Sequence, residues 1–194
     1  LDYKSVNIEL PLFLSNNFNG KIINPTTDCE FDGKIIMTEF YNKNDYPTAI
    51  DDYGISKVYC NMLLKQKKNV KQLRTSILGP ELNSKVSLME WFLKQSIDVN
   101  GYIDHYWNGI TTLEWAKQCH NIINNWNGSD PLIQVGTEKI NKYMLLQIIN
   151  EVYCSGKNII PYKTEMINKC LVSDIKLSTI KDQLIQLKKF TENA

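Results

Sequence analysis

The chain has 194 residues, 43% hydrophobic and 22% charged, which is the balance of an ordinary globular protein able to bury a core. Its 22 basic and 21 acidic residues leave a net charge of +1, so no electrostatic footprint indicates a nucleic-acid or anionic-membrane partner. No apolar run reaches the length of a membrane span, and the opening residues do not form a signal-peptide pattern.

The five cysteines are widely spaced and form no Cys-x-x-Cys pair, and only two histidines occur. We therefore expect neither a disulfide framework nor a metal site. Free thiols are typical of a reducing compartment, so this cysteine usage predicts a cytoplasmic protein.

The first half of the chain alternates helices and strands. Apolar spacing predicts a helix over 6–18, a short strand over 21–24, a second helix over 53–66 and a strand over 70–78. This order is typical of the β–α units of a parallel sheet. Residues 31–52 are rich in Gly, Asn, Asp and Pro and predict an irregular loop, and so long a loop inside a compact domain is usually functional.

The second half contains more helix. Ser87 and Glu90 form a capping-box pattern that opens one predicted helix, and Thr111 and Glu114 open another. The remaining predicted elements are a strand over 132–135, a helix over 141–153 and a last helix from Thr179.

Tyr53 and Lys57 form a Tyr-x-x-x-Lys pattern at the start of a predicted helix. Residues four apart share one helical face, and an ammonium near a phenol lowers the phenol pKa, which suits a general acid or base. The pattern alone carries little weight, because a tyrosine and a lysine on an amphipathic helix are more often a plain solvated face. A second match, Tyr153 and Lys157, contains Gly156 and indicates a turn instead.

Three runs in order resemble signatures of the extended short-chain dehydrogenases/reductases. Residues 26–33, Thr-Thr-Asp-Cys-Glu-Phe-Asp-Gly, resemble the family's Ser-Thr-Asp-x-Val-Phe-x-Gly run. Residues 53–57 match its Tyr-Gly-x-Ser-Lys helix, and residues 73–79 are similar to the strand that follows. Residues 101–114 are similar to the segment entering the substrate lobe of the dTDP-4-dehydrorhamnose reductase-like members, which reduce nucleotide-linked 4-keto-6-deoxy sugars.

The resemblance implies an α/β fold with a Rossmann-like parallel sheet, incomplete because its first βα units are missing, and a small C-terminal α+β lobe. Residues 1–80 would be the C-terminal portion of the NAD(P)-binding domain. Residues 81–194 would be mainly the substrate-binding lobe, with segments that can return to the Rossmann core. A nucleotide-diphosphate 4-keto-6-deoxy sugar is the implied substrate, NADPH or NADH the implied cofactor, and a homo-oligomer the implied assembly.

The resemblance also implies a role for each matching residue. Tyr53 would protonate the substrate oxygen, Lys57 would tune Tyr53 and hold the nicotinamide ribose, and Thr27 would hydrogen-bond the substrate carbonyl. The implied cofactor contacts are Tyr53, Lys57, Arg74, Thr75 and Ser76. The implied substrate contacts are Asp28, Phe31, Tyr106 and Trp107.

The sequence also departs from the family pattern. The Gly-x-x-Gly-x-x-Gly turn that cradles the cofactor pyrophosphate is not among these residues, so the resemblance places on the order of a hundred residues, about three βα units, before Leu1. Pro25 removes a backbone donor from a strand expected to be central, and Glu30 replaces an apolar residue. These departures favour two alternatives: a non-catalytic relative, like the regulatory subunit of methionine adenosyltransferase, or a truncated inactive product.

Overall fold

The computed structural model describes residues 2–34, 39–81, 87–96 and 98–193. At its centre lies a parallel sheet of β1 (Ile22–Thr26), β2 (Val70–Arg74) and β7 (Leu132–Gln134), in the order β1-β2-β7. The α/β class and the partial Rossmann-like architecture predicted from the sequence are confirmed. β7 joins this sheet although it lies in the second half of the chain.

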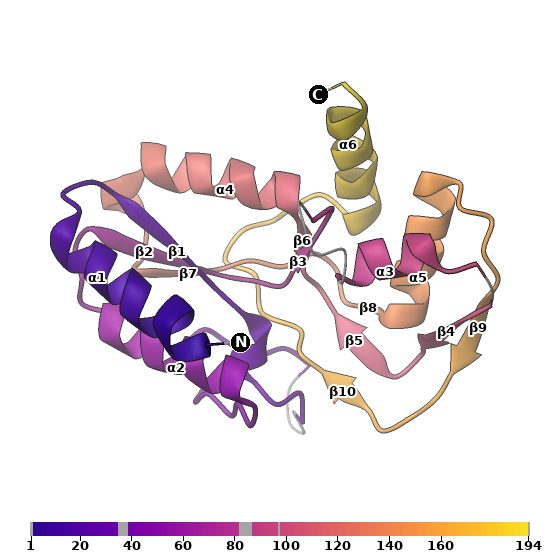
Figure 1. Ribbon diagram of the computed structural model, residues 1–194, viewed down its shortest axis with the longest axis horizontal. Helices are drawn as coiled ribbons and strands as arrows, with labels where there is room; N and C mark the ends of the chain where they lie inside the picture. Colours follow the sequence, from indigo (N-terminus) through magenta and orange to yellow (C-terminus); the bar gives the residue numbers. More distant parts are fainter. Residues whose placement is uncertain (1, 35–38, 82–86, 97, 194) are drawn as a thin grey trace.

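Helices cover both faces of the sheet (Figure 1). The π-helix η1 (Ser5–Glu9), α1 (Leu10–Asn17) and α2 (Asp52–Leu64) lie below the sheet in this view, and α4 (Thr112–Asn124) lies above it. Successive strand residues point to opposite faces, and the packing follows this alternation. Ile22 packs with α2 residues, whereas Ile23 packs in the cluster that contains residues of α4.

The remaining elements form a smaller lobe beside the sheet (Figure 1). Three short sheets have the orders β10-β5-β8, β3-β6 and β4-β9, and they pack with α3, α5 and α6. The strands are β3 (Ile77–Leu78), β4 (Val99–Tyr102), β5 (His105–Trp107), β6 (Ile110–Thr111), β8 (Ile140–Asn141), β9 (Ile159–Tyr162) and β10 (Ile167–Asn168). The helices of this lobe are α3 (Leu88–Lys94), α5 (Lys142–Tyr153) and α6 (Ile180–Glu192), whereas the short helices η2 (Asp28–Glu30) and η3 (Trp126–Gly128) follow β1 and α4.

Most helix starts predicted from the sequence are present with their capping hydrogen bonds. Thr111 Oγ1 accepts from the Glu114 amide at 3.2 Å, and Thr179 caps α6 in the same way. The capping box predicted at Ser87 is not formed, because the Ser87 hydroxyl instead points back to the Gly79 carbonyl. The strand predicted over 70–78 is broken into β2 and β3.

The Tyr153–Lys157 match is a turn, as predicted. α5 ends at Tyr153, Cys154 adopts a left-handed conformation with φ of 50°, and Gly156 has φ of 63°. The two side chains therefore do not share a helical face.

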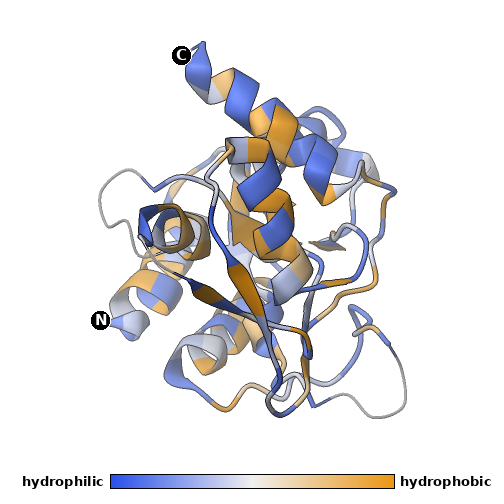
Figure 2. Ribbon diagram, turned by 90° about the vertical axis from the view of Figure 1, so that its right-hand side faces the viewer, coloured by the Kyte–Doolittle hydropathy of each residue, from blue (hydrophilic) through white to orange (hydrophobic). Residues whose placement is uncertain are grey.

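The helices on the lower face of the sheet leave many of their large apolar side chains exposed to solvent. η1, α1 and α2 bury one large apolar residue, Leu64, and otherwise small or polar ones: Asn7, Ser15, Gly54, Ser56 and Cys60. Large apolar side chains of the same helices are exposed: Val6, Leu10, Phe13, Leu14, Ile55, Tyr59 and Leu63, called here the outer apolar face. In Figure 2 hydrophobic residues are visible on the helix that follows the N-terminus, and α6 alternates between hydrophobic and hydrophilic residues, as an amphipathic helix does.

Within the described residues, no helix combines the length and the apolar character that a transmembrane segment needs.

Candidate functional site

Thr27, Tyr53 and Lys57 meet at the carboxyl end of β1. Thr27 follows the last residue of β1, and Tyr53 and Lys57 occupy the first two turns of α2. The Thr27 side chain lies near enough to the Tyr53 hydroxyl to lower the pKa of Tyr53. The Lys57 ammonium lies 5.8 Å from the centre of the Tyr53 ring and donates to the Pro25 carbonyl at 3.2 Å. The structure thus brings together the three residues that the sequence predicted as catalytic.

Two side-chain hydrogen bonds to backbone amides and one glycine hold these residues in place. Thr27 Oγ1 accepts from the Cys29 amide at 3.1 Å and so starts η2, which turns the chain back toward α2. The Asp51 side chain caps α2 by accepting from the Gly54 amide at 2.7 Å. A Cβ at Gly54 would lie 2.2 Å from the Cys29 carbonyl oxygen, so only glycine lets α2 come this close to η2. This close approach brings Tyr53 to Thr27.

Burial is the main influence on the pKa values of Tyr53 and Lys57. Desolvation raises the pKa of Tyr53 above its usual value, and the interaction with Thr27 lowers it only in part. Desolvation also lowers the pKa of Lys57. Lys57 is expected to lower the pKa of Tyr53, but burial is the largest influence on that pKa in this structure and raises it. Tyr53 is therefore protonated at neutral pH and suits the donation of a proton.

A second buried group lies directly beside Thr27. Thr27 Oγ1 donates to Asp28 Oδ1 at 3.1 Å, and burial raises the pKa of the Asp28 carboxyl, opposed by the charge of Lys142. Burial lowers the pKa of Lys142, whose ammonium lies 5.2 Å from the centre of the Trp107 ring. The charge interaction between Lys142 and Asp28 joins the start of α5 to the residues just after β1, and the sequence did not predict it.

Other predicted contact residues lie in the protein interior. Phe31 is fully buried and stacks on Tyr41 at a ring distance of 4.1 Å, so its side chain is closed to a ligand. Trp107 is part of the lobe core, whereas Tyr106 is half-buried beneath the Lys139 ammonium, 4.6 Å from its ring.

The predicted cofactor contacts at the end of β2 are a buried arginine and the two residues that follow it. The Arg74 side chain is buried and ion-paired with Glu30 at 2.5 Å. Thr75 is buried and Ser76 half-buried, and both lie just after β2, which pairs in parallel register with β1. Thr75 and Ser76 therefore lie at the same edge of the sheet as Thr27.

Two of the departures from the family pattern, Pro25 and Glu30, have structural explanations. The Ile22 amide donates to β2, so alternation directs the nitrogen of Pro25 away from that strand. Among the described strands β1 is at the sheet edge, where a missing donor is tolerated. Glu30 is fully buried, and Arg74 supplies its counter-charge.

Asn7 also helps to hold the helix that carries Tyr53 in place, and the sequence did not predict this role. It lies in the π-helix η1, and its buried amide donates to Ser56 Oγ at 2.9 Å, which ties η1 to the helix that carries Tyr53. The sequence signal that could have pointed to this contact is Ser56, the serine of the Tyr-Gly-x-Ser-Lys run. Ser56 also donates to the Tyr53 carbonyl. For metals, no group of three or more potential protein ligands exists within the described part of the chain.

Comparison with known proteins defines the fold. No protein-family model matches the sequence, and no curated protein matches it significantly. Solved structures do match over nearly the whole chain, and they are Rossmann-type enzymes of the short-chain dehydrogenase/reductase class.

Two of these structures are dTDP-4-dehydrorhamnose reductases. The protein from Clostridium acetobutylicum ATCC 824 is 18% identical with a TM-score of 0.79, covering 98% of this chain and 73% of that one. The protein from Bacillus anthracis str. Ames, in complex with NADP, is 16% identical with a TM-score of 0.78, covering 96% and 70%. A dTDP-glucose 4,6-dehydratase from the same organism, in complex with NAD, is 13% identical with a TM-score of 0.73, covering 98% and 68%. This chain therefore has a nucleotide-sugar reductase-like fold.

Proposed function

We propose that this protein reduces the keto group of a nucleotide-diphosphate 4-keto-6-deoxy sugar, of the dTDP- or UDP-4-dehydrorhamnose type, with NADPH or NADH. The observation that carries the proposal is the meeting of Thr27, Tyr53 and Lys57 at the carboxyl end of a parallel strand. In open α/β sheets, ligands bind outside the carboxyl ends of the strands. The fold shared with nucleotide-sugar enzymes supports this class of substrate.

Each residue of the set has a role in the proposed reaction. Tyr53 donates its proton to the substrate oxygen as the carbonyl becomes a hydroxyl, and its raised pKa keeps that proton in place beforehand. The Thr27 hydroxyl, turned from Asp28 toward the substrate, donates a second hydrogen bond to the same oxygen and fixes its position. Lys57 supplies a positive charge that stabilises the tyrosinate left after proton donation. Asp28 and Tyr106 are the substrate contacts that the geometry still favours.

The residues present fit the reacting end of a nicotinamide cofactor. Among described protein groups, Lys57 donates one hydrogen bond, to Pro25, and an ammonium has two further N–H groups for ribose hydroxyls. Thr75 and Ser76 follow β2 at the same sheet edge and would border the nicotinamide. When bound, the cofactor supplies the hydride. The Arg74 side chain is already engaged by Glu30 and contributes no cofactor contact in this arrangement.

The proposal extends to assembly and location. The seven residues of the outer apolar face are each 39–61% exposed. Exposed apolar patches of this extent are unusual on monomers and mark protein interfaces. We propose that a second copy of the chain covers it, in a homodimer. The free cysteines favour the cytoplasm as the compartment.

One experiment distinguishes a catalytic protein from a non-catalytic one that only binds the sugar nucleotide. The protein at its natural length is mixed with NADPH or NADH and with dTDP- or UDP-linked 4-keto-6-deoxyhexose, and cofactor oxidation is followed by absorbance. We expect oxidation that depends on the sugar nucleotide. If calorimetry detects sugar-nucleotide binding without any oxidation, the non-catalytic alternative replaces this proposal. If neither occurs, the proposed substrate class is wrong.

A further inference from the structure

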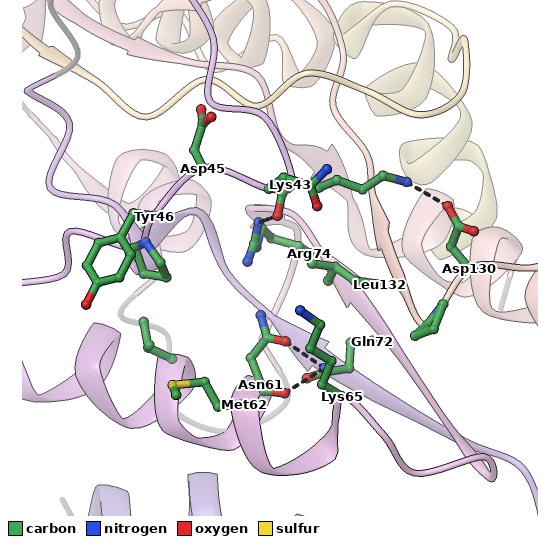
Figure 3. Close-up of a pocket in the computed structure, with 14 residues that line it drawn as sticks. Lys43, Asp45, Tyr46, Asn61, Met62, Lys65, Gln72, Arg74, Asp130 and Leu132 are labelled. Atoms are coloured by element: carbon green, nitrogen blue, oxygen red, sulfur yellow. Dashed lines mark hydrogen bonds and ion pairs between the residues drawn. The ribbon is translucent and has the colours of Figure 1, made fainter.

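A pocket lies on the lower face of the sheet, apart from the proposed catalytic residues. It has a volume of about 400 Å³ and lies between the C-terminal half of α2, residues 43–47 and the start of β7 (Figure 3). Its lining does not include Thr27, Tyr53 or Lys57. A volume of this size is typical of small-molecule sites.

The walls of the pocket are mainly apolar. Side chains of α2, the 43–47 segment and the residues entering β7 form them: Pro47, Val58, Met62, Pro131 and Leu132. Tyr46 is largely exposed and stands at one side, where its ring can lie over a bound molecule (Figure 3). These groups suit the apolar body of a ligand.

The floor is a rigid polar network. Gln72 Nε2 donates to Asn61 Oδ1 at 2.7 Å, and Asn61 Nδ2 donates to Glu30 at 3.1 Å. Glu30 in turn pairs with Arg74, whose Nη1 donates to Gln134 at 3.0 Å. Because these groups satisfy one another, the floor holds its shape without a ligand.

One donor of this floor is unsatisfied. Arg74 is 2% exposed, and its Nε has no hydrogen-bond partner; among the described side chains only Trp115 has another such buried atom. Buried donors without an acceptor are rare in folded proteins. In Figure 3 the Arg74 guanidinium points into the space between the 43–47 segment and α2. An acceptor oxygen entering the pocket, directly or through a water, would satisfy it.

One lysine that lines the pocket has no carboxylate partner among the described residues. Lys43 is neutralised by Asp130 at 2.7 Å and by Asp174 at 3.2 Å. Lys65, in contrast, forms no hydrogen bond or ion pair within the described residues, and its ammonium reaches toward Arg74 in Figure 3. The carboxylate of Asp45 is turned away from both cations in the same view.

We infer that this pocket binds a small organic anion, with a phosphate or carboxylate group beside Lys65 and Arg74 and an apolar body against Met62 and Tyr46. The site is independent of the proposed reductase chemistry. Its floor nevertheless continues through Glu30 to Thr26, the neighbour of Thr27, because Thr26 Oγ1 donates to the Glu30 carboxylate.

The test is a titration followed by NMR of methyl-labelled methionine, with the Met62 signal assigned through Met62→Leu. The ligands are phenyl phosphate, benzoate, phenol and inorganic phosphate. We expect phenyl phosphate or benzoate to shift the Met62 methyl signal saturably, and the tighter of the two identifies the anionic group. Phenol and inorganic phosphate, which each lack one half of the ligand, should bind at least about tenfold more weakly.

Two matched variants localise the binding. Lys65→Glu should weaken the better anion at least about tenfold, whereas Lys68→Glu should change it less than about twofold. Lys68 is an exposed lysine three residues on that does not line this pocket, so it controls for net charge. The inference is overturned if neither anion shifts Met62, if the two variants weaken binding equally, or if inorganic phosphate binds as tightly as phenyl phosphate.

Discussion

The carboxylate of Glu30 and the guanidinium of Arg74 lie 2.5 Å apart, with exposed fractions of 0% and 2%. Arg74 is the only arginine of the chain, and Glu30 stands where the family signature has an apolar residue. The pair links the loop after β1 to the end of β2. A buried charge keeps its ionised form only with a partner, so each residue depends on the other.

We predict that Arg74→Met lowers the free energy of unfolding by about 3–5 kcal/mol, because it leaves the Glu30 carboxylate buried without a counter-charge. The double variant Glu30→Leu with Arg74→Met should recover much of this loss. Urea unfolding followed by circular dichroism measures both. If the losses of Glu30→Leu and Arg74→Met simply add in the double variant, the two charges are not coupled.

The activity should persist at alkaline pH. A general acid works only while protonated, and burial raises the pKa of Tyr53 above the ordinary tyrosine value. Activity that depends on this proton is therefore retained through neutral pH and lost only as pH rises past the raised pKa. A profile of kcat/KM against pH tests this, since it reports groups of the free enzyme. A loss of kcat/KM between pH 7 and 9 that Tyr53→Phe removes would contradict the assignment.

Gly54→Ala should reduce activity strongly while the protein still folds. The added Cβ would meet the Cys29 carbonyl oxygen at 2.2 Å, so α2 must move away and separate Tyr53 from Thr27. Overpacking of this kind costs about 1–3 kcal/mol of stability. The control is Gly128→Ala, whose added methyl meets only the movable side chain of Asn125. Activity and melting temperature are compared for both, and equal activity would show that the close approach is unnecessary.

Phe13→Glu and Tyr59→Glu should convert the proposed homodimer into a monomer, because each places a charge in the outer apolar face. Phe190→Glu is the matched control, since Phe190 is equally exposed on α6, outside that face. Light scattering coupled to size-exclusion chromatography gives the mass of each variant. A monomeric wild type, or a dimer that survives both substitutions, would remove the self-association proposal.

The parts of the structure that depend on local sequence were predictable. Thr111 and Thr179 mark the starts of α4 and α6 because a capping hydrogen bond spans only three residues. The Thr27, Tyr53 and Lys57 set was predicted because three runs of the sequence resemble family signatures in the right order.

Contacts across long sequence separations could not be predicted in this way. Asp28 and Lys142 are far apart in the sequence, and nothing near Lys142 signals that α5 begins beside β1. The Glu30–Arg74 pair was missed for the same reason, and Glu30 was interpreted only as a departure from a signature. The raised pKa of Tyr53 depends on burial, which the Tyr-x-x-x-Lys spacing does not determine.

The central claim is that Tyr53 donates the proton, and one comparison tests it most directly. Tyr53→Phe and Tyr59→Phe remove the same hydroxyl from the same helix, but Tyr59 lies on the outer apolar face. In the sugar-nucleotide-dependent oxidation of NADPH or NADH, Tyr53→Phe should lower kcat by about 10²–10⁴-fold, and Tyr59→Phe should leave it within about twofold of wild type. Equal rates for wild type and Tyr53→Phe would contradict the account.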